Sequence, residues 1–444
     1  MSGDSVSSTS NGSAATLSAA EADGLLASTI LTDEGRQDPY PSYARLRAET
    51  EVDGEPGRWD TAFGLLGLAG YHDCLEVLRH PRLGRPEADM DQPLSLSGQA
   101  RGRSLEGVPS MLFLNPPDHT RIRGLVSRAF TPKRVEELRP QIEVLLAPVL
   151  DRVAELGGGD VMAELAIPFP VAVISELLGV PKEGNEHIRP LVRDVTAFID
   201  PAADDEAMQR ATTSAALLAT YFTELIEEKR THPDDRLLSA LIQVEEAGDR
   251  LAPDELLVNT LLLYAAGFET TSNLIGNGLR LLLANPDQMQ RLRDDRDLLG
   301  SAMWEILRAD SPVQLNNRVV LEEVELFGQR RSRGASFIVL QGAANHDERV
   351  YPDAGRFDVG RFAHTGDTGS DDAAPPPLSF GWGAHHCLGA HLARAEGEIA
   401  FGAMLDAFSS IELDTNELVD GRLHYRPSFT LRGLDALPIA VSTA

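Results

Sequence analysis

The fold is decided by residues 380–389, which read Phe380-Gly381-Trp382-Gly383-Ala384-His385-His386-Cys387-Leu388-Gly389. A helical pattern follows at residues 390–407, so Cys387 lies where a glycine-rich loop meets the start of a helix. The free amides and the dipole of a helix start favour anionic sulfur, and the thiolate is the form that binds a metal. The glycines allow the backbone to approach a flat partner such as a porphyrin. This stretch therefore predicts a cysteine thiolate as a metal ligand.

Two other interpretations of the same residues are weaker. A lone cysteine is often only a small buried apolar residue. The neighbouring histidines could suggest a metal site, but His385, His386 and Cys387 are consecutive, which is a poor arrangement for three ligands to converge on one ion. A single axial ligand fits the stretch better.

The composition limits which partners the protein can bind and in which cellular compartment we expect it. The 444 residues include 40 basic and 68 acidic ones, for a net charge of −28, which argues against binding to a nucleic-acid backbone. The two cysteines, Cys74 and Cys387, are too few and too far apart for a disulfide framework or a four-ligand zinc site. No apolar run reaches the roughly 20 residues that span a bilayer, and the N-terminus lacks the features of a secretory signal. We therefore expect a cytoplasmic protein with no membrane span and no nucleic-acid partner.

Hydrophobic periodicity predicts a mainly α protein with a small β-rich region. Residues 1–30 are rich in Ser, Ala and Gly, so we expect a disordered tail there and a single domain over residues 31–444. A loop is expected at residues 365–377, which contain three consecutive prolines. Helices are predicted at residues 43–49, 71–79, 119–130, 132–154, 167–178, 211–229, 254–283, 286–294 and 390–407, and strands at residues 318–327, 335–340, 423–430 and 438–442.

The cysteine loop resembles that of the cytochrome P-450 family of haem-thiolate monooxygenases, soluble bacterial type, whose pattern is Phe-x-x-Gly-x-His/Arg-x-Cys-x-Gly. The matching residues are Phe380, Gly383, His385, Cys387 and Gly389. The resemblance implies the cytochrome P-450 fold, with heme b (iron protoporphyrin IX) between the long central helix and the cysteine-loop helix. It also implies that Cys387 binds the iron and that Phe380, Gly381, His385 and Gly389 contact the haem.

A second segment, Ala266-Gly267-Phe268-Glu269-Thr270-Thr271, resembles the oxygen-activation motif of the family's central helix. Standing alone, it could equally contain hydroxyls that bond back to the preceding turn and a solvated glutamate. The resemblance implies instead that Glu269 relays protons and that Thr270 hydrogen-bonds during oxygen activation. Ala266 and Gly267 would leave room beside the haem.

A third segment contains Glu305 and Arg308, three residues apart on a predicted helix and therefore on one face. Such pairs are usually surface pairs. The resemblance implies that this one is the family's Glu-x-x-Arg, and that Arg356 would complete a buried structural triad with no catalytic role.

A fourth segment, residues 115–123, resembles the family's entry into the helix that contacts the haem propionates. His119 and Arg123 are four residues apart and share a helical face. By resemblance, Arg318 and His385 would also bind the propionates. Four donors for two carboxylates are physically reasonable, because buried anions require hydrogen-bonded cations.

The implied function is a haem-dependent monooxygenase that inserts one atom of O2 into a hydrophobic small molecule, by hydroxylation or epoxidation, in bacterial secondary, lipid, terpenoid or steroid metabolism. Electrons would come from a ferredoxin and its reductase, with Arg128, Lys133 and Arg134 as candidates for the docking patch. A peroxide-driven peroxygenase and a non-catalytic haem-thiolate binding or sensing protein are the alternatives.

By family analogy, the substrate pocket would include residues 81–114 and Leu262, Ala265, Val313, Gln314, Asn316, Phe429 and Thr430.

Overall fold

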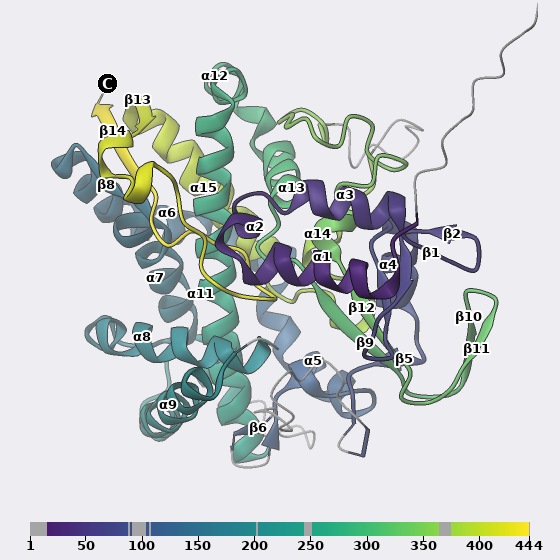
Figure 1. Ribbon diagram of the computed structural model, residues 1–444. Coiled ribbons are helices and arrows are strands. Elements are labelled where there is room, and N and C mark those ends of the chain that lie inside the picture. Colours follow the sequence, from purple (N-terminus) through teal and green to yellow (C-terminus); the bar gives the residue numbers. More distant parts are fainter. Residues whose placement is uncertain are drawn as a thin grey trace, which may run out of the picture.

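The computed structural model describes residues 16–87, 89–90, 104–105, 108–200, 203–243, 251–363 and 374–443. It is mainly helical, and its largest sheet lies on one side of the molecule, next to the N-terminal helices (Figure 1). The expected fold class, mainly α with a small β-rich region, is confirmed. Among the described helices, none combines the length and the apolar composition needed to cross a bilayer.

The central helix α11 (Pro253–Ala284) runs lengthwise through the middle of the view in Figure 1. Pro253 occupies its first turn, where no backbone N–H is needed, and the Glu255 carboxylate accepts a hydrogen bond of 2.9 Å from the Ala252 amide. Its 32 residues span about 48 Å at 1.5 Å per residue. The helix packs against α7, α9 and α15, so that it holds the helical half of the protein together.

The other helices begin and end close to the predicted residues where clear capping residues are present. Thr131 caps the start of α6, and Gly157, in the left-handed conformation with φ 68°, ends it. The predicted helix at 119–130 becomes α5 followed by a 3-10 turn, Ser127–Phe130. The bounds are α1 Ala19–Leu31, α2 Asp33–Gln37, α3 Tyr40–Glu49, α4 Tyr71–Arg79, α5 Asp118–Val126, α6 Pro132–Leu156, α7 Pro168–Leu178, α8 Asn185–Val195, α9 Asp205–Thr231, α10 Leu237–Gln243, α12 Pro286–Asp294, α13 Leu299–Ala309, α14 Gln341–Ala344 and α15 Ala390–Ala407.

The largest sheet has the strand order β3-β4-β12-β9-β5. Its central strand β12 pairs in parallel with β4 and antiparallel with β9. A second sheet, β13-β14-β8, packs at the far end of α6 and α15. The bounds are β3 Arg58–Asp60, β4 Leu66–Leu68, β5 Leu83–Gly84, β8 Gly158–Asp160, β9 Asn316–Val320, β12 Ser336–Val339, β13 Phe408–Leu413 and β14 Pro438–Thr443, with hairpins β1 Glu51–Val52 and β2 Glu55–Pro56, β6 Ser104–Leu105 and β7 Val108–Pro109, and β10 Val324–Leu326 and β11 Gln329–Arg331.

Two strand predictions need correction. The strand expected at residues 318–327 is divided into β9 and β10, because a turn separates them. The strand expected at residues 423–430 is wrong: only an isolated bridge, between Tyr425 and Leu434, occurs there. Pro427 in this segment has no amide hydrogen to donate to a ladder, which is the physical reason.

The expected tail over residues 1–30 is too long at its C-terminal end. Residues 19–31 form α1, which begins with a capping box between Ser18 and Glu21. Ala22, Leu26 and Ile30 recur every fourth residue and are buried against the sheet and α3. The Ser- and Ala-rich composition concealed this apolar stripe. Residues 1–15, and residues 365–373 of the expected loop, lie outside the described residues.

Candidate functional site

A cavity of about 570 Å3 lies between α11 and the loop that leads into α15. Cys387 lines it from the loop and Thr270 lines it from α11. Most of the other side chains are apolar, and they come from segments far apart in sequence: Met111, Leu112, Phe113, Val258, Leu261, Leu262, Ala265, Leu274, Leu307, Val313, Leu315 and Val319. The cavity therefore combines a thiol with a mainly hydrophobic wall, as a pocket for a flat cofactor and an apolar ligand requires.

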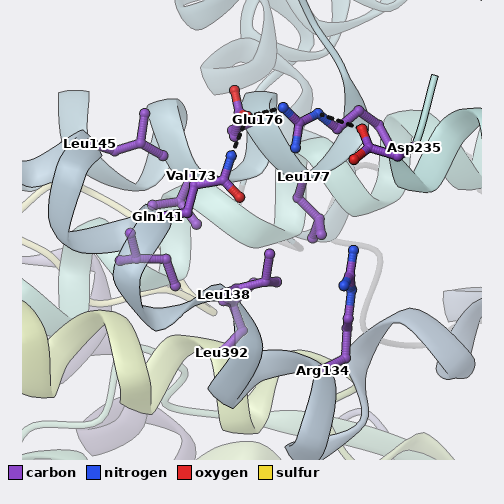
Figure 2. Close-up of a pocket in the computed structure, with 11 residues that line it drawn as sticks. Arg134, Leu138, Gln141, Leu145, Val173, Glu176, Leu177, Asp235 and Leu392 are labelled. Atoms are coloured by element: carbon purple, nitrogen blue, oxygen red, sulfur yellow. Dashed lines mark hydrogen bonds and ion pairs between the residues drawn. The ribbon is translucent and has the colours of Figure 1, made fainter.

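A second hollow, between α6, α7 and the start of α10, holds only about 30 Å3 (Figure 2). Leucines form much of its wall, and Figure 2 shows the Glu176 carboxylate linked to the side chains of Gln141 and Arg236. A single water molecule needs about 10–15 Å3 of such space. This hollow can hold no more than a few waters, so the larger cavity is the candidate site.

The cysteine loop is held by its own backbone. The Cys387 amide donates to the Phe380 carbonyl at 2.8 Å, and Gly381 and Gly383 adopt left-handed φ angles of 64° and 71°. A Cβ atom at Gly383 would lie 2.6 Å from the Leu78 carbonyl oxygen, so only glycine fits there. These contacts turn the Cys387 side chain toward the cavity.

Desolvation by the surrounding protein raises the pKa of the Cys387 thiol, although its side chain is exposed to the cavity; the Gly389 amide and the Arg123 charge oppose this effect without overcoming it. The sequence had suggested an environment that favours the thiolate. In the protein alone, desolvation outweighs the helix start, and a metal is what would make the thiolate the stable form.

A group of cationic and imidazole side chains gathers next to the cysteine loop. The His119 and His385 rings lie 4.3 Å apart, and the Arg123 Nη2 donates to the His386 carbonyl at 2.6 Å. Burial, followed by the charges of Arg123 and Arg85, lowers the pKa of His119 to about 4. Burial also lowers the pKa of His385, to about 2, with nearby arginines adding to the effect. Both imidazoles are therefore neutral at pH 7.

Arg318 on β9 belongs to the same group. Its Nη1 donates to the Asn316 side-chain oxygen and to the Asn317 carbonyl, both at 2.8 Å. Burial and the charge of Arg85 lower its pKa well below the ordinary value, so the guanidinium needs a compensating anion. Within the described part of the chain, neither Arg123 nor Arg318 forms an ion pair with a carboxylate.

These residues fit the haem that the resemblance implies. The Arg318 Nη2 and the His385 Nε2 are buried and have no hydrogen-bond partner among the described residues. Buried donors without acceptors next to uncompensated cations indicate a site for an anion, and haem carries two carboxylates. His119, Arg123 and His385 line the cavity; Arg318 lies beside them without lining it. Phe380, Gly381 and Gly389 line the cavity as well.

The motif on α11 also lines the cavity, through Ala266, Gly267, Glu269 and Thr270. The Thr270 hydroxyl donates to the Ala266 carbonyl at 2.9 Å, which is the back-bonding that threonine in a helix often shows. Glu269 is not solvated: it is 5% exposed and forms an ion pair of 2.6 Å with Arg426. No local pattern points to this partner, which lies 157 residues further along the chain.

A second acid, Glu396 on α15, was missed in the sequence. It lines the cavity, is 2% exposed, and its Oε2 has no partner among the described residues. Burial raises its pKa well above the ordinary value. A detectable signal existed, because Glu396 falls on the apolar face of α15 together with Leu392 and Ile399.

The buried pair Glu305 and Arg308 is present, with two contacts of 2.8 Å. The expected third member, Arg356, is wrong: its side chain is exposed and only its carbonyl accepts from Arg308. Arg361 takes that place, with its Nε 3.1 Å from the Glu305 Oε2. The tight turn at residues 352–356 points the Arg356 side chain outward, whereas Arg361 folds back across the turn.

The predicted pocket residues divide into two groups. Leu262, Ala265, Val313, Asn316 and Thr430 line the cavity. Gln314 and Phe429 lie outside its lining, which corrects their assignment. The Gln314 amide is turned back to donate to the Ser311 carbonyl at 2.7 Å, and the Phe429 side chain packs toward the core formed by α1, α3 and the sheet.

Comparison with known proteins agrees with this geometry. The family model described as Cytochrome P450 matches residues 191–425. The vitamin D(3) 25-hydroxylase of Pseudonocardia autotrophica is 38% identical over 91% of this chain and 94% of its own length. The 6-deoxyerythronolide B hydroxylase of Saccharopolyspora erythraea is 36% identical over 92% and 97%.

A solved structure supports the same relationship. The crystal structure of the myxobacterial cytochrome P450 CYP267B1 in complex with myristic acid superposes with a TM-score of 0.78 at 35% identity, covering 93% of this chain and 99% of that one. Relatives of this similarity match the chain almost from end to end, and the chain belongs to the cytochrome P450 family of haem-dependent monooxygenases.

Proposed function

We propose that this haem monooxygenase hydroxylates or epoxidises a lipophilic small molecule of polyketide, steroid or fatty-acyl type. The observation that carries the proposal is the apolar wall of the 570 Å3 cavity opposite Cys387. The names of the relatives support it, since a vitamin D(3) hydroxylase, a 6-deoxyerythronolide B hydroxylase and a complex with myristic acid all involve lipophilic molecules. An apolar wall binds such molecules by removing their surface from water.

The residues around the cavity divide the work. Haem, when bound through the Cys387 sulfur, supplies the activation of O2. The Thr270 hydroxyl donates a hydrogen bond to the Ala266 carbonyl in the structure, and it rotates away from this carbonyl to hold a proton at the cavity wall. Glu269 relays protons from solvent, and its ion pair with Arg426, whose side chain is 13% exposed, holds the carboxylate between solvent and the cavity. His119, Arg123, Arg318 and His385 bind the haem carboxylates.

We infer that a ferredoxin and its reductase supply the electrons. Arg128, Lys133 and Arg134 are exposed at the end of α5 and the start of α6, the helix pair that also presents Arg123 to the cysteine loop. Ferredoxins are acidic, so a local basic patch would steer their approach to this otherwise acidic protein. Reversing the charge of Arg128 and Lys133 should slow electron transfer and weaken its dependence on salt. The same reversal at Arg210, an exposed arginine of α9, is the matched control.

The main test is a titration of the purified protein with lipophilic compounds while the visible spectrum is recorded. A macrolactone, vitamin D3 and a long-chain fatty acid cover the three classes. We expect one class to shift the haem from low to high spin, and the same class to be oxidised with O2, ferredoxin and reductase. Product formed from peroxide alone, with none from the complete electron chain, would favour the peroxygenase instead. A haem spectrum that no lipophile shifts would contradict the proposed substrate class.

A further inference from the structure

One part of the cavity wall is a single turn of chain, residues 110–113, between the hairpin strand β7 and α5. The Phe113 amide donates to the Ser110 carbonyl at 3.0 Å, which closes the turn. All four of its residues line the cavity: Ser110, Met111, Leu112 and Phe113. Since so short a turn has few hydrogen bonds of its own, its place depends on what holds it to the helices.

A buried asparagine holds this turn to α11. The Met111 amide donates to the Asn259 Oδ1 at 2.9 Å. Asn259 is 1% exposed and Met111 is 7% exposed, so water hardly competes for the bond. Asn259 lies outside the lining of the cavity, whereas its neighbours Val258 and Leu261 belong to it. Asn259 can therefore act on a ligand only through the wall that it holds.

A second hydrogen bond fixes the orientation of the Asn259 amide. Its Nδ2 donates to the Glu255 carbonyl, one turn earlier on α11, at 2.7 Å. With the nitrogen engaged there, the oxygen faces the Met111 amide. The Glu255 carboxylate pairs with Arg121 of α5, the helix that follows the turn. The start of α11 thus contacts both the turn and the helix after it.

An asparagine at this place in α11 needs a reason. It lies within the apolar run of residues 256–263, where a weak helix former with a buried amide is unfavourable unless the amide has partners. The neighbouring Thr260 hydroxyl bonds within the helix, to the Leu256 carbonyl at 2.8 Å, whereas Asn259 bonds to another segment. Without Asn259, the Met111 amide would be buried with no acceptor there, and the turn would shift to find one.

We propose that Asn259 is a positioning residue for substrate selection, which sets where the turn 110–113 stands relative to α11. This inference rests on the proposed function, since it takes the apolar wall as the surface that binds a lipophilic substrate. A wall that is already in place binds a ligand more tightly than a wall that the ligand must first order. Asn259 should therefore affect ligands large enough to reach the wall and leave small ones unaffected.

The test titrates the holoenzymes of the wild type, N259L and N277L with three azoles that bind haem iron through nitrogen: imidazole, 4-phenylimidazole and clotrimazole. The shift of the Soret band gives each Kd. We expect N259L to bind clotrimazole about tenfold more weakly, because the unsatisfied Met111 amide no longer fixes the wall, and imidazole within about twofold of the wild type.

Asn277 is the matched control on the same helix. It is fully buried, lies outside the cavity lining, and its Nδ2 donates to the carbonyls of Asp310 at 3.3 Å and Arg432 at 3.1 Å. N277L should keep the wild-type Kd for all three azoles. A tenfold loss of clotrimazole affinity in N277L as well would overturn the proposal, because any buried asparagine of α11 would then have the same effect.

Hydrogen exchange of the peptide that contains Met111 gives the second readout. It should be faster in N259L and unchanged in N277L. Faster exchange with wild-type azole affinities would mean that Asn259 only braces the backbone, and the proposal would be wrong. N259D, whose buried carboxyl is favoured in the protonated form, can accept and donate as asparagine does and should restore clotrimazole binding.

Two further outcomes are separable. If N259L does not fold, N259A removes the same acceptor with a smaller side chain, and wild-type affinities in N259A would overturn the proposal. A wild-type enzyme that binds imidazole but gains no affinity with azole size would contradict the proposed function of the apolar wall. Affinity that rises with size equally in the wild type and N259L would contradict the role of Asn259 alone.

Discussion

At the scale of single residues, the Thr270 hydroxyl is the group whose role is easiest to isolate. Thr270→Ala removes the hydroxyl and should lower the product formed per reductant consumed by about tenfold, with the difference released as peroxide, because proton placement fails while electrons still arrive. Haem content should stay at the wild-type level. Ser272→Ala is the control, since Ser272 makes the same kind of back-bond, to Phe268, but is buried away from the cavity lining. Unchanged coupling in Thr270→Ala would contradict the assignment.

The pair Glu269 and Arg426 allows a second residue-scale prediction. Arg426→Ala leaves a carboxylate that is 5% exposed without its cation, and should cost about 3 kcal/mol of unfolding free energy. Glu269→Gln in the same chain should recover part of this loss, with a coupling of about 1–3 kcal/mol in the double-mutant cycle. Urea unfolding of the four proteins measures it. Arg422, an exposed arginine that pairs with Asp33 at 2.6 Å, serves as the control position. Additive losses would mean that the two residues do not interact.

Residues inside a short pattern could be predicted, and residues brought in from elsewhere could not. Cys387, His119, Arg123 and Thr270 belong to patterns in which the spacing itself carries information. Arg85 reaches the cavity, and Arg426 reaches Glu269 on its wall, only because the sheet and the C-terminal turn bring distant segments together. A single sequence contains no local signal for a contact between residues 269 and 426.

At the scale of elements, the ion-pair cluster between α13 and the turn after α14 distinguishes two arginines that look alike in sequence. Arg361→Leu removes the side chain that contacts Glu305 and should cost about 3 kcal/mol, because a fully buried carboxylate loses a partner. Arg356→Leu, at an exposed side chain, should stay within about 0.5 kcal/mol of the wild type. Urea midpoints and retained haem give the comparison. Equal losses in both variants would restore the prediction made from the sequence.

The bounds of helices and strands could be predicted from the sequence where clear capping or turn-forming residues flank them. α4, α12 and α15 begin and end at the predicted residues, since turn-forming residues flank a clear apolar period. The helix α1 was missed because Ala and Ser filled its exposed face and resembled a flexible segment. The strand expected at residues 423–430 looked extended, yet its hydrogen bonds go to turns and to other segments. Periodicity indicates an apolar face but does not tell which partner that face meets.

At the scale of the whole molecule, Asp310 joins elements from both ends of the chain. It is buried, and it pairs with Arg280 at 2.9 Å and Arg432 at 2.6 Å, while the Tyr40 hydroxyl donates to it at 2.8 Å. Burial alone would raise its pKa, but the charges of Arg432 and Arg280 and the Tyr40 hydrogen bond outweigh burial and lower it. The ionised carboxylate is therefore part of the folded state.

Acid should remove this contribution. Since the folded-state pKa of Asp310 lies below its ordinary value of 3.8, the contribution is present at neutral pH, begins to fall near pH 4, and is lost as the pH drops through the folded-state pKa. Asp310→Asn should cost about 3 kcal/mol at pH 7 and flatten the decline in stability below pH 4. Asp235→Asn, at an exposed carboxylate, is the control. Urea unfolding from pH 7 to pH 3 measures both, and an unchanged slope in Asp310→Asn would contradict the assignment.

The same cluster bears on the order in which the chain can fold during synthesis. Arg432 donates to the Arg36 carbonyl across 396 residues, and Tyr40 contacts Asp310 across 270. Tyr40 gains its partner only after 270 further residues have been made, and the Arg36 carbonyl still lacks Arg432 while the C-terminal end is inside the ribosome, so the N-terminal helices cannot complete their docking before then. The first segment made is therefore among the last to be fixed, and a nascent chain that stops before residue 432 would leave its own beginning loose.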